Sequence, residues 1–97
     1  MMLPDSTVEM IKITVESMNP HGWMLPPQYD EAIIGMAHVD ANGPVVCYSL
    51  NETLDVMERM QWVTSEQAAN WLHSNILTTS EPGAPVFLSI PVETAMQ

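Results

Sequence analysis

The side chains of this 97-residue chain that could do chemistry are three histidines, one cysteine and scattered carboxylates. His21, His38 and His73, together with Asp40 or Cys47, are residue types that bind zinc and similar metals. A pre-organised metal site needs histidines one helical turn apart or a short Cys-x-x-Cys knuckle, and neither spacing occurs here. We therefore assign no metal and no cofactor, and expect the histidines to be isolated polar or half-buried residues.

Nucleophilic and acid–base catalysis find equally little support. Cys47 lies in the apolar run "VVCYS", where a cysteine is usually a small core residue and where nothing lowers its pKa. Asp30 and Glu31 stand together at the start of a strand pattern, but acid–base catalysis requires one carboxylate to be desolvated in a pocket. The four glycines are scattered singly, so no phosphate-binding loop is indicated. We expect a protein that is not an enzyme.

The chain is strongly acidic, with 12 Asp and Glu against a single lysine and a single arginine, which gives a formal net charge of −10. Phosphate contacts require clustered lysines and arginines, so we expect no direct binding to nucleic acid or to an anionic membrane. The partner that this charge fits is a protein with a basic surface.

The cysteine count and the apolar runs indicate a soluble, intracellular protein. One cysteine cannot form an intramolecular disulfide, which argues against an oxidising compartment. The first ten residues, "MMLPDSTVEM", lack the basic and apolar regions of a signal peptide. The apolar runs are far shorter than the roughly 20 residues of a membrane-spanning helix.

The N-terminal third contains one ambiguous element, a loop and the first strand of a hairpin. Residues 6–18 fit both a strand and a helix, and their β-branched content favours a strand. Residues 19–28 hold three prolines and a glycine and predict a loop. Residues 31–39 and 45–49 predict two strands joined by a turn centred on Asn42-Gly43, which Pro44 could lengthen, while Gly35 could mark a bulge.

A helix is expected over residues 50–60. Ser49 can cap the backbone N–H of Glu52, whose side chain can return to the Ser49 backbone in a capping box. Asp55 and Arg59 are spaced for an ion pair one helical turn apart on the outer face. The expected apolar stripe consists of Leu50, Leu54 and Met57.

A second helix is expected from the "TSEQ" motif at residues 64–67 to about Leu77. Its predicted inward residues are Ala68, Ala69, Leu72 and Ile76. Residues 86–90, "VFLSI", predict a short final strand.

These elements predict one small α+β domain, with a small antiparallel sheet, made of the hairpin and the C-terminal strand, packed against two short helices. Residues 1–29 form the N-terminal strand or helix and the proline-rich loop, residues 30–90 the compact core, and residues 91–97 a polar tail. A chain of this length supports one hydrophobic core.

Tryptophans are the most specific candidates for an exposed contact surface, because a small domain cannot completely bury three indoles. Trp23 lies in the proline-rich loop, Trp62 in the connection between the two helices, and Trp71 within the second helix. Each could equally pack at the edge of the core. A second copy of the chain is one possible partner, since two-fold homodimers are the commonest oligomers.

Four segments resemble a group of small uncharacterised proteins from tailed bacteriophages, over about residues 30–88: "DEAIIGMA", "PVVCYSLNETLDVM", "TSEQAANWLHSNIL" and "EPGAPVF". The matching positions are Asp30, Glu31, Gly35, Tyr48, Glu66, Ala68, Asn75, Pro85 and Phe87. The resemblance implies a viral accessory protein that acts in the cytoplasm of a bacterial host. It implies no catalytic or binding residue.

The sequence thus favours a small acidic accessory protein that binds and inhibits a host protein, a defence or nucleic-acid-handling factor, by presenting carboxylates where that factor expects phosphates. The expected contact residues are Glu52, Asp55, Glu58, Glu66, Trp62 and Trp71. The alternative is a structural module that acts as a homodimer in virion morphogenesis.

Overall fold

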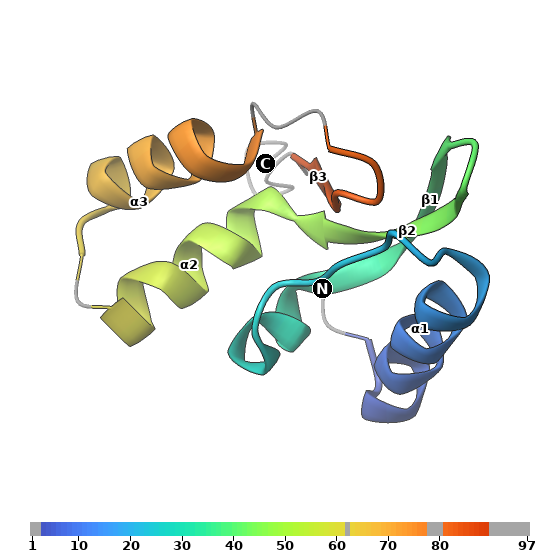
Figure 1. Cartoon of the computed structure of the whole chain (residues 1–97). Helices are drawn as coiled ribbons and strands as arrows, with labels where there is room; N and C mark the ends of the chain where they lie inside the picture. Colours follow the sequence, from blue (N-terminus) through green and yellow to red (C-terminus); the bar gives the residue numbers. More distant parts are fainter. Residues whose placement is uncertain (1–2, 62, 78–80, 90–97) are drawn as a thin grey trace, which may run out of the picture.

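The computed structural model describes residues 3–61, 63–77 and 81–89. Its elements, in chain order, are α1 (Asp5–Met18), the 3₁₀ helix η1 (Pro27–Ala32), β1 (Ile33–Asp40), β2 (Gly43–Ser49), α2 (Leu50–Gln61), α3 (Ser65–Leu72), the π-helical turn η2 (His73–Leu77) and β3 (Val86–Leu88). The fold is α+β, as the sequence predicts. In Figure 1, α1 lies beneath the hairpin of β1 and β2, and the pair of α2 and α3 lies beyond the opposite end of the strands.

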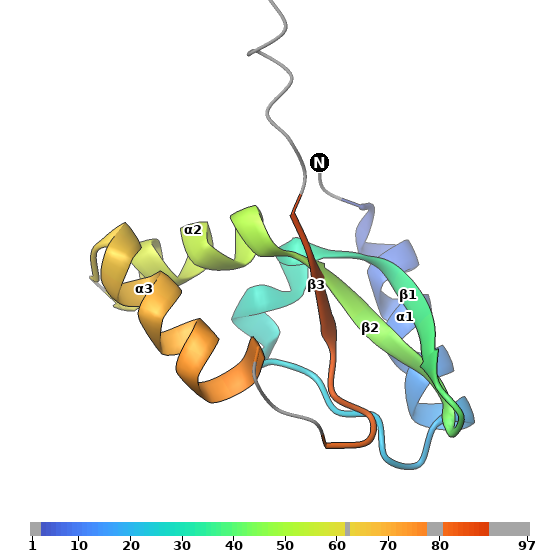
Figure 2. The ribbon, with the colours of Figure 1, turned by 90° about the horizontal axis from the view of Figure 1, so that it is seen from above.

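The sheet is mixed, with strand order β1-β2-β3. β1 and β2 are antiparallel, but β3 is parallel to β2, with Cys47 opposite Val86 and Tyr48 opposite Phe87. The prediction of an all-antiparallel sheet is therefore wrong for its third strand. The physical reason is the connection: the chain leaves β2 into α2 and returns along α3, a helical crossover that brings it back in the direction of β2. Figure 2 shows the three strands side by side.

The hairpin of β1 and β2 forms as predicted, with the turn one residue earlier in the chain. Asp40 pairs with Gly43, so the loop has two residues, Ala41 and Asn42, and Pro44 does not lengthen it. Gly43 opens β2 with a φ of +138°, where the Cβ of any other residue would lie 2.5 Å from the carbonyl oxygen of Met18. The register between β1 and β2 shifts between Ile33 and Gly35, which agrees with the bulge that Gly35 suggested in the sequence.

The N-terminal element is a helix, so the preference for a strand is wrong. Val8, Ile11 and Val15 are buried at helical spacing, and they pack in one cluster with Val46 of the sheet. This continuous buried stripe outweighs the modest strand preference of β-branched residues. The helix ends at Asn19, whose buried side-chain amide donates to the carbonyl oxygen of Pro44 at 3.1 Å and so fixes α1 to the hairpin.

Tyr48 lies at the centre of the core, fully buried on β2. Its ring stacks on Phe87 of β3 with 5.5 Å between the ring centroids. Its hydroxyl accepts a hydrogen bond of 2.9 Å from the backbone N–H of Leu25, which ties the proline-rich loop to the sheet. Burial raises the pKa of Tyr48 to about 12.

The two predicted helices are confirmed. Ser49 Oγ accepts from the N–H of Glu52 at 3.3 Å, and Thr64 and Gln67 form a reciprocal capping box. Ala69 is exposed and its predicted inward placement is wrong, because the buried side of this segment follows Ala68, Leu72 and Ile76. In α2 the buried side chains are Thr53, Val56 and Met57, with Leu50 and Leu54 half-buried beside them. Across the described residues, none of the helices has both the length and the apolar content to cross a bilayer.

Candidate protein-binding surface

Three of the four predicted contact acids lie along the outer side of α2. Glu52, Asp55 and Glu58 follow one another at intervals of three residues, each step turning about 60° around the helix. Asp55 is exposed and the two glutamates are half-buried, whereas Val56 and Met57 on the other side of the helix are fully covered. The structure therefore brings these three carboxylates onto one stripe, which was not predicted from the sequence.

The middle of this stripe is neutralised by Arg59. The guanidinium donates from Nε to Asp55 at 3.0 Å, the predicted ion pair, and from Nη2 to Glu31 at 2.5 Å. The hydrogen bonds that Arg59 donates to Glu31 and, with a smaller effect, to Asp55 raise the pKa of Arg59. Glu31 is 28 residues away from Arg59 in the chain, so local spacing could not reveal this second partner.

Lys12 is also held by an acid. Its Nζ lies 2.8 Å from Asp30 Oδ2, in a partly buried ion pair between α1 and η1. The hydrogen bond to Asp30 raises the pKa of Lys12, although desolvation acts in the opposite direction. Since the chain contains no other lysine or arginine, both of its permanent cations are engaged in ion pairs with its own carboxylates.

An apolar groove lies between α2 and α3. It has a volume of about 280 Å³ and is lined by Met57, Val63, Gln67, Ala68 and Trp71. Trp71 is 51% exposed, so a large part of its indole remains in water. The sequence singled out Trp71 but not Val63 or Gln67, which become lining residues only because α3 folds back along α2.

The fourth predicted acid, Glu66, is exposed in the first turn of α3. Glu66 directly precedes Gln67, which lines the groove from α3. Glu58 directly follows Met57, which lines the groove from α2, so each helix carries an acid next in the chain to a lining residue. Trp62, the other predicted contact, lies outside the described residues. Trp23 is half-buried against the core, and its buried Nε1 has no hydrogen-bond partner among the described residues.

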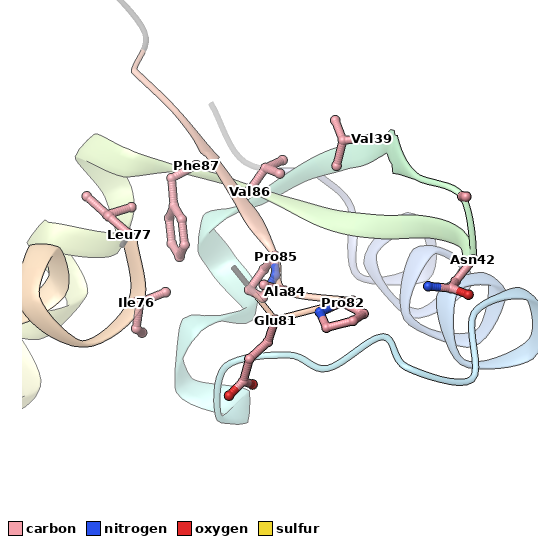
Figure 3. A pocket seen from close by; sticks show the side chains of 12 residues that line it. Val39, Asn42, Ile76, Leu77, Glu81, Pro82, Ala84, Pro85, Val86 and Phe87 are labelled. Carbon is pink, nitrogen blue, oxygen red and sulfur yellow. The ribbon is translucent and has the colours of Figure 1, made fainter. Parts of the chain in front are cut away.

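A larger hollow lies elsewhere, between the hairpin tip, the end of η2 and the segment that leads into β3. Its volume is about 650 Å³, and Glu81 is the only titratable residue among the described residues that line it. Figure 3 shows Phe87 and Val86 projecting to opposite sides of β3, with the carboxylate of Glu81 turned away from both. Apart from Asn42 and Glu81, the described residues that line it are aliphatic residues, prolines, a glycine and Phe87.

The residues weighed for metal or nucleophilic chemistry are not brought together. His21, His38 and His73 are all exposed, and the described part of the chain holds no group of three histidine, cysteine or acidic residues placed for a metal ion. Cys47 is half-buried on β2, and desolvation raises the pKa of its thiol.

Comparison of the chain with family models, with curated proteins and with solved structures gives no match.

Proposed function

We propose that this protein is a non-enzymatic binding protein whose α2–α3 pair docks onto a protein with a basic surface. The observation that carries the proposal is an exposed tryptophan that lines an apolar groove, with Glu58 and Glu66 next in the chain to the lining residues Met57 and Gln67. A half-exposed indole over a hydrophobic pocket is a typical anchor of protein interfaces. The acids supply the long-range attraction, because a net charge of −10 steers the chain toward positive surfaces.

The resemblance to bacteriophage proteins extends the proposal. The partner is then a protein of the bacterial host, in the host cytoplasm, and binding inhibits it. A defence or nucleic-acid-handling factor is the class whose surface carries the required basic groove.

Mimicry of DNA is the narrower form of this idea, and the geometry of α2 supports it less well. Residues three apart rise about 4.5 Å along a helix, so the stripe from Glu52 to Glu58 extends only about 9 Å. Its middle carboxylate, Asp55, is paired with Arg59. An anchor with flanking acids therefore accounts for the surface better than a row of phosphate substitutes.

The test is capture of partners from bacterial lysate at low and moderate salt, with matched variants. Trp71→Ala removes the anchor, and Ile13→Ala is its control, since Ile13 on α1 is 54% exposed and the tryptophan 51%. We expect a specific partner to be retained by wild type and by the control. Loss of a central aromatic anchor weakens binding by about 30-fold, which corresponds to about 2 kcal/mol.

The electrostatic part is tested with Glu58→Gln combined with Glu66→Gln, against Glu9→Gln combined with Glu16→Gln on α1. Both pairs remove two negative charges, but only the first pair lies beside the groove. We expect the first to reduce capture more strongly, and the difference to shrink as salt screens it. Recovery of the bait alone, or equal loss with both pairs, would refute the proposed surface.

A further inference from the structure

Within the part of the chain that the structure describes, no strand lies beside the outer edge of β1. β1 is an end strand of the sheet, eight residues long, and pairs only with β2 among the described residues. α1 covers a face of the sheet rather than this edge, because its buried side chains Val8, Ile11 and Val15 pack with Val46 and Tyr48 of β2. Figures 1 and 2 show α1 beneath the strands, with no other element drawn along the outer side of β1.

Proteins usually protect such an edge with lysine, proline, a very short strand or a covering segment. β1 reads "IIGMAHVD", with neither lysine nor proline, and its only charged residue at neutral pH is Asp40 at its end. The register of β1 with β2 shifts at two places, between Ile33 and Gly35 and between Ala37 and Asp40, and these two irregularities are the protective features along it. Met36 and Val39 also expose apolar side chains there, 40% and 69% respectively.

We propose that β1 pairs with β1 of a second copy of this chain, in antiparallel orientation about a two-fold axis, and so joins two three-stranded sheets into one of six strands. A strand and its own copy can always pair in this way. The charge distribution is the reason for proposing a second copy of this chain as the partner. A chain with a net charge of −10 repels itself over most of its surface, and the seven residues before Asp40 are free of carboxylates.

A basic segment of another protein would have no acidic side chain to pair with along those seven residues. The edge of β1 is therefore unsuited to the basic partner that is proposed for the α2–α3 surface.

Pairing centred on Ala37 fits the side chains. Ala37 of one copy then lies opposite Ala37 of the other, and residues at equal distances before and after it face each other. Val39 of one copy therefore lies opposite Gly35 of the other. A Cβ placed on Gly35 has no atom within 4 Å, which leaves room for the larger residue. Asp40 lies opposite Ile34, so no carboxylate opposes another.

The strength of the dimer follows from the length of the contact. In this register seven residues of each copy, 34–40, are paired, and they extend about 23 Å. One strand pair buries less than the roughly 800 Å² per partner of a standard stable interface, so dissociation is expected on the order of micromolar.

The experiment is sedimentation equilibrium of the full chain over a range of concentrations around that value, at moderate salt. Val39→Lys places a charge on the edge, and Ile13→Lys on α1 makes the same change of charge at another exposed aliphatic residue. Lower net charge favours self-association in both variants. We expect Val39→Lys nevertheless to weaken the dimer at least tenfold, and Ile13→Lys to leave it as strong or stronger.

Gly35→Val is the second variant, because the space around Gly35 accepts the side chain within one copy, and circular dichroism verifies its fold. We expect it to weaken the dimer at least tenfold by occupying the place of Val39. A wild-type chain that stays monomeric at every concentration overturns the proposal, and so does equal weakening by the two lysine variants or an unchanged dimer in Gly35→Val. Trp71→Ala is expected to keep the dimer, so failure of the binding surface and failure of this pairing are distinguishable.

Discussion

Replacing Tyr48 with Phe tests how the core holds the proline-rich loop. The substitution keeps the buried ring and its stacking on Phe87, and removes only the hydroxyl that accepts from the N–H of Leu25. At neutral pH we expect Tyr48→Phe to be less stable by about 1 kcal/mol, the typical net value of one intramolecular hydrogen bond.

The sign of this difference reverses at alkaline pH. The pKa of Tyr48 is raised from 10.0 to about 12 in the folded protein, because the buried ring cannot ionise without losing its solvation. The unfolded chain therefore loses the Tyr48 proton first, so the stability of wild type is intact below pH 10 and falls as the pH rises toward 12. Two pKa units correspond to about 2.7 kcal/mol over that interval. The two stability curves are expected to cross near pH 10.7, where wild type has lost about 1 kcal/mol.

The measurement is urea unfolding of both proteins at several pH values from neutral to about 11.5, compared as a difference in unfolding free energy. Every other ionisable group is present in both proteins, so its contribution cancels in the difference. A difference that stays constant with pH would show that the hydroxyl of Tyr48 is not buried as the structure has it.

Three further outcomes are expected. Added NaCl raises the melting temperature, measured by circular dichroism, because screening reduces the self-repulsion of a chain with a net charge of −10; a flat or falling curve contradicts this. Leu72→Ala, at a fully buried position of α3, lowers the unfolding free energy by about 2 to 5 kcal/mol, whereas Ala69→Ser on the exposed side changes it by no more than about 0.5. Gly43→Ala destabilises by more than about 1 kcal/mol, since its Cβ meets the Met18 carbonyl oxygen; an unfolding curve that matches wild type rejects this placement.

The elements that were predictable from the sequence are those whose signals are local. Ser49 and Thr64 satisfy backbone N–H groups three residues ahead, so the start of each helix is encoded within one turn. The hairpin is encoded in the same way by the glycine that its positive φ requires.

The features that were not predictable depend on contacts between distant segments. The direction of β3 is set by how α2 and α3 carry the chain across, and no property of "VFL" distinguishes parallel from antiparallel pairing. The β-branched residues of α1 favour a strand taken alone, and only the sheet against which Val8, Ile11 and Val15 pack makes the helical stripe the better solution. The candidate site contains a contact of the same kind. The hydrogen bond from Arg59 to Glu31 joins α2 to η1, two segments that are far apart in the sequence, so local spacing could not predict it.

That last contact changes what the acidic residues can do. With Asp55 paired to Arg59, and Asp30 to Lys12, the carboxylates that remain are not an ordered row but a diffuse negative field around the molecule. A diffuse field accelerates encounter with any basic protein and distinguishes poorly between them. Discrimination must then come from a shaped apolar contact, and of the predicted contact residues that the structure describes, Trp71 is the one that lines such a groove. Trp71→Ala is accordingly expected to slow association little and to accelerate dissociation, whereas Glu58→Gln with Glu66→Gln acts chiefly on the association rate.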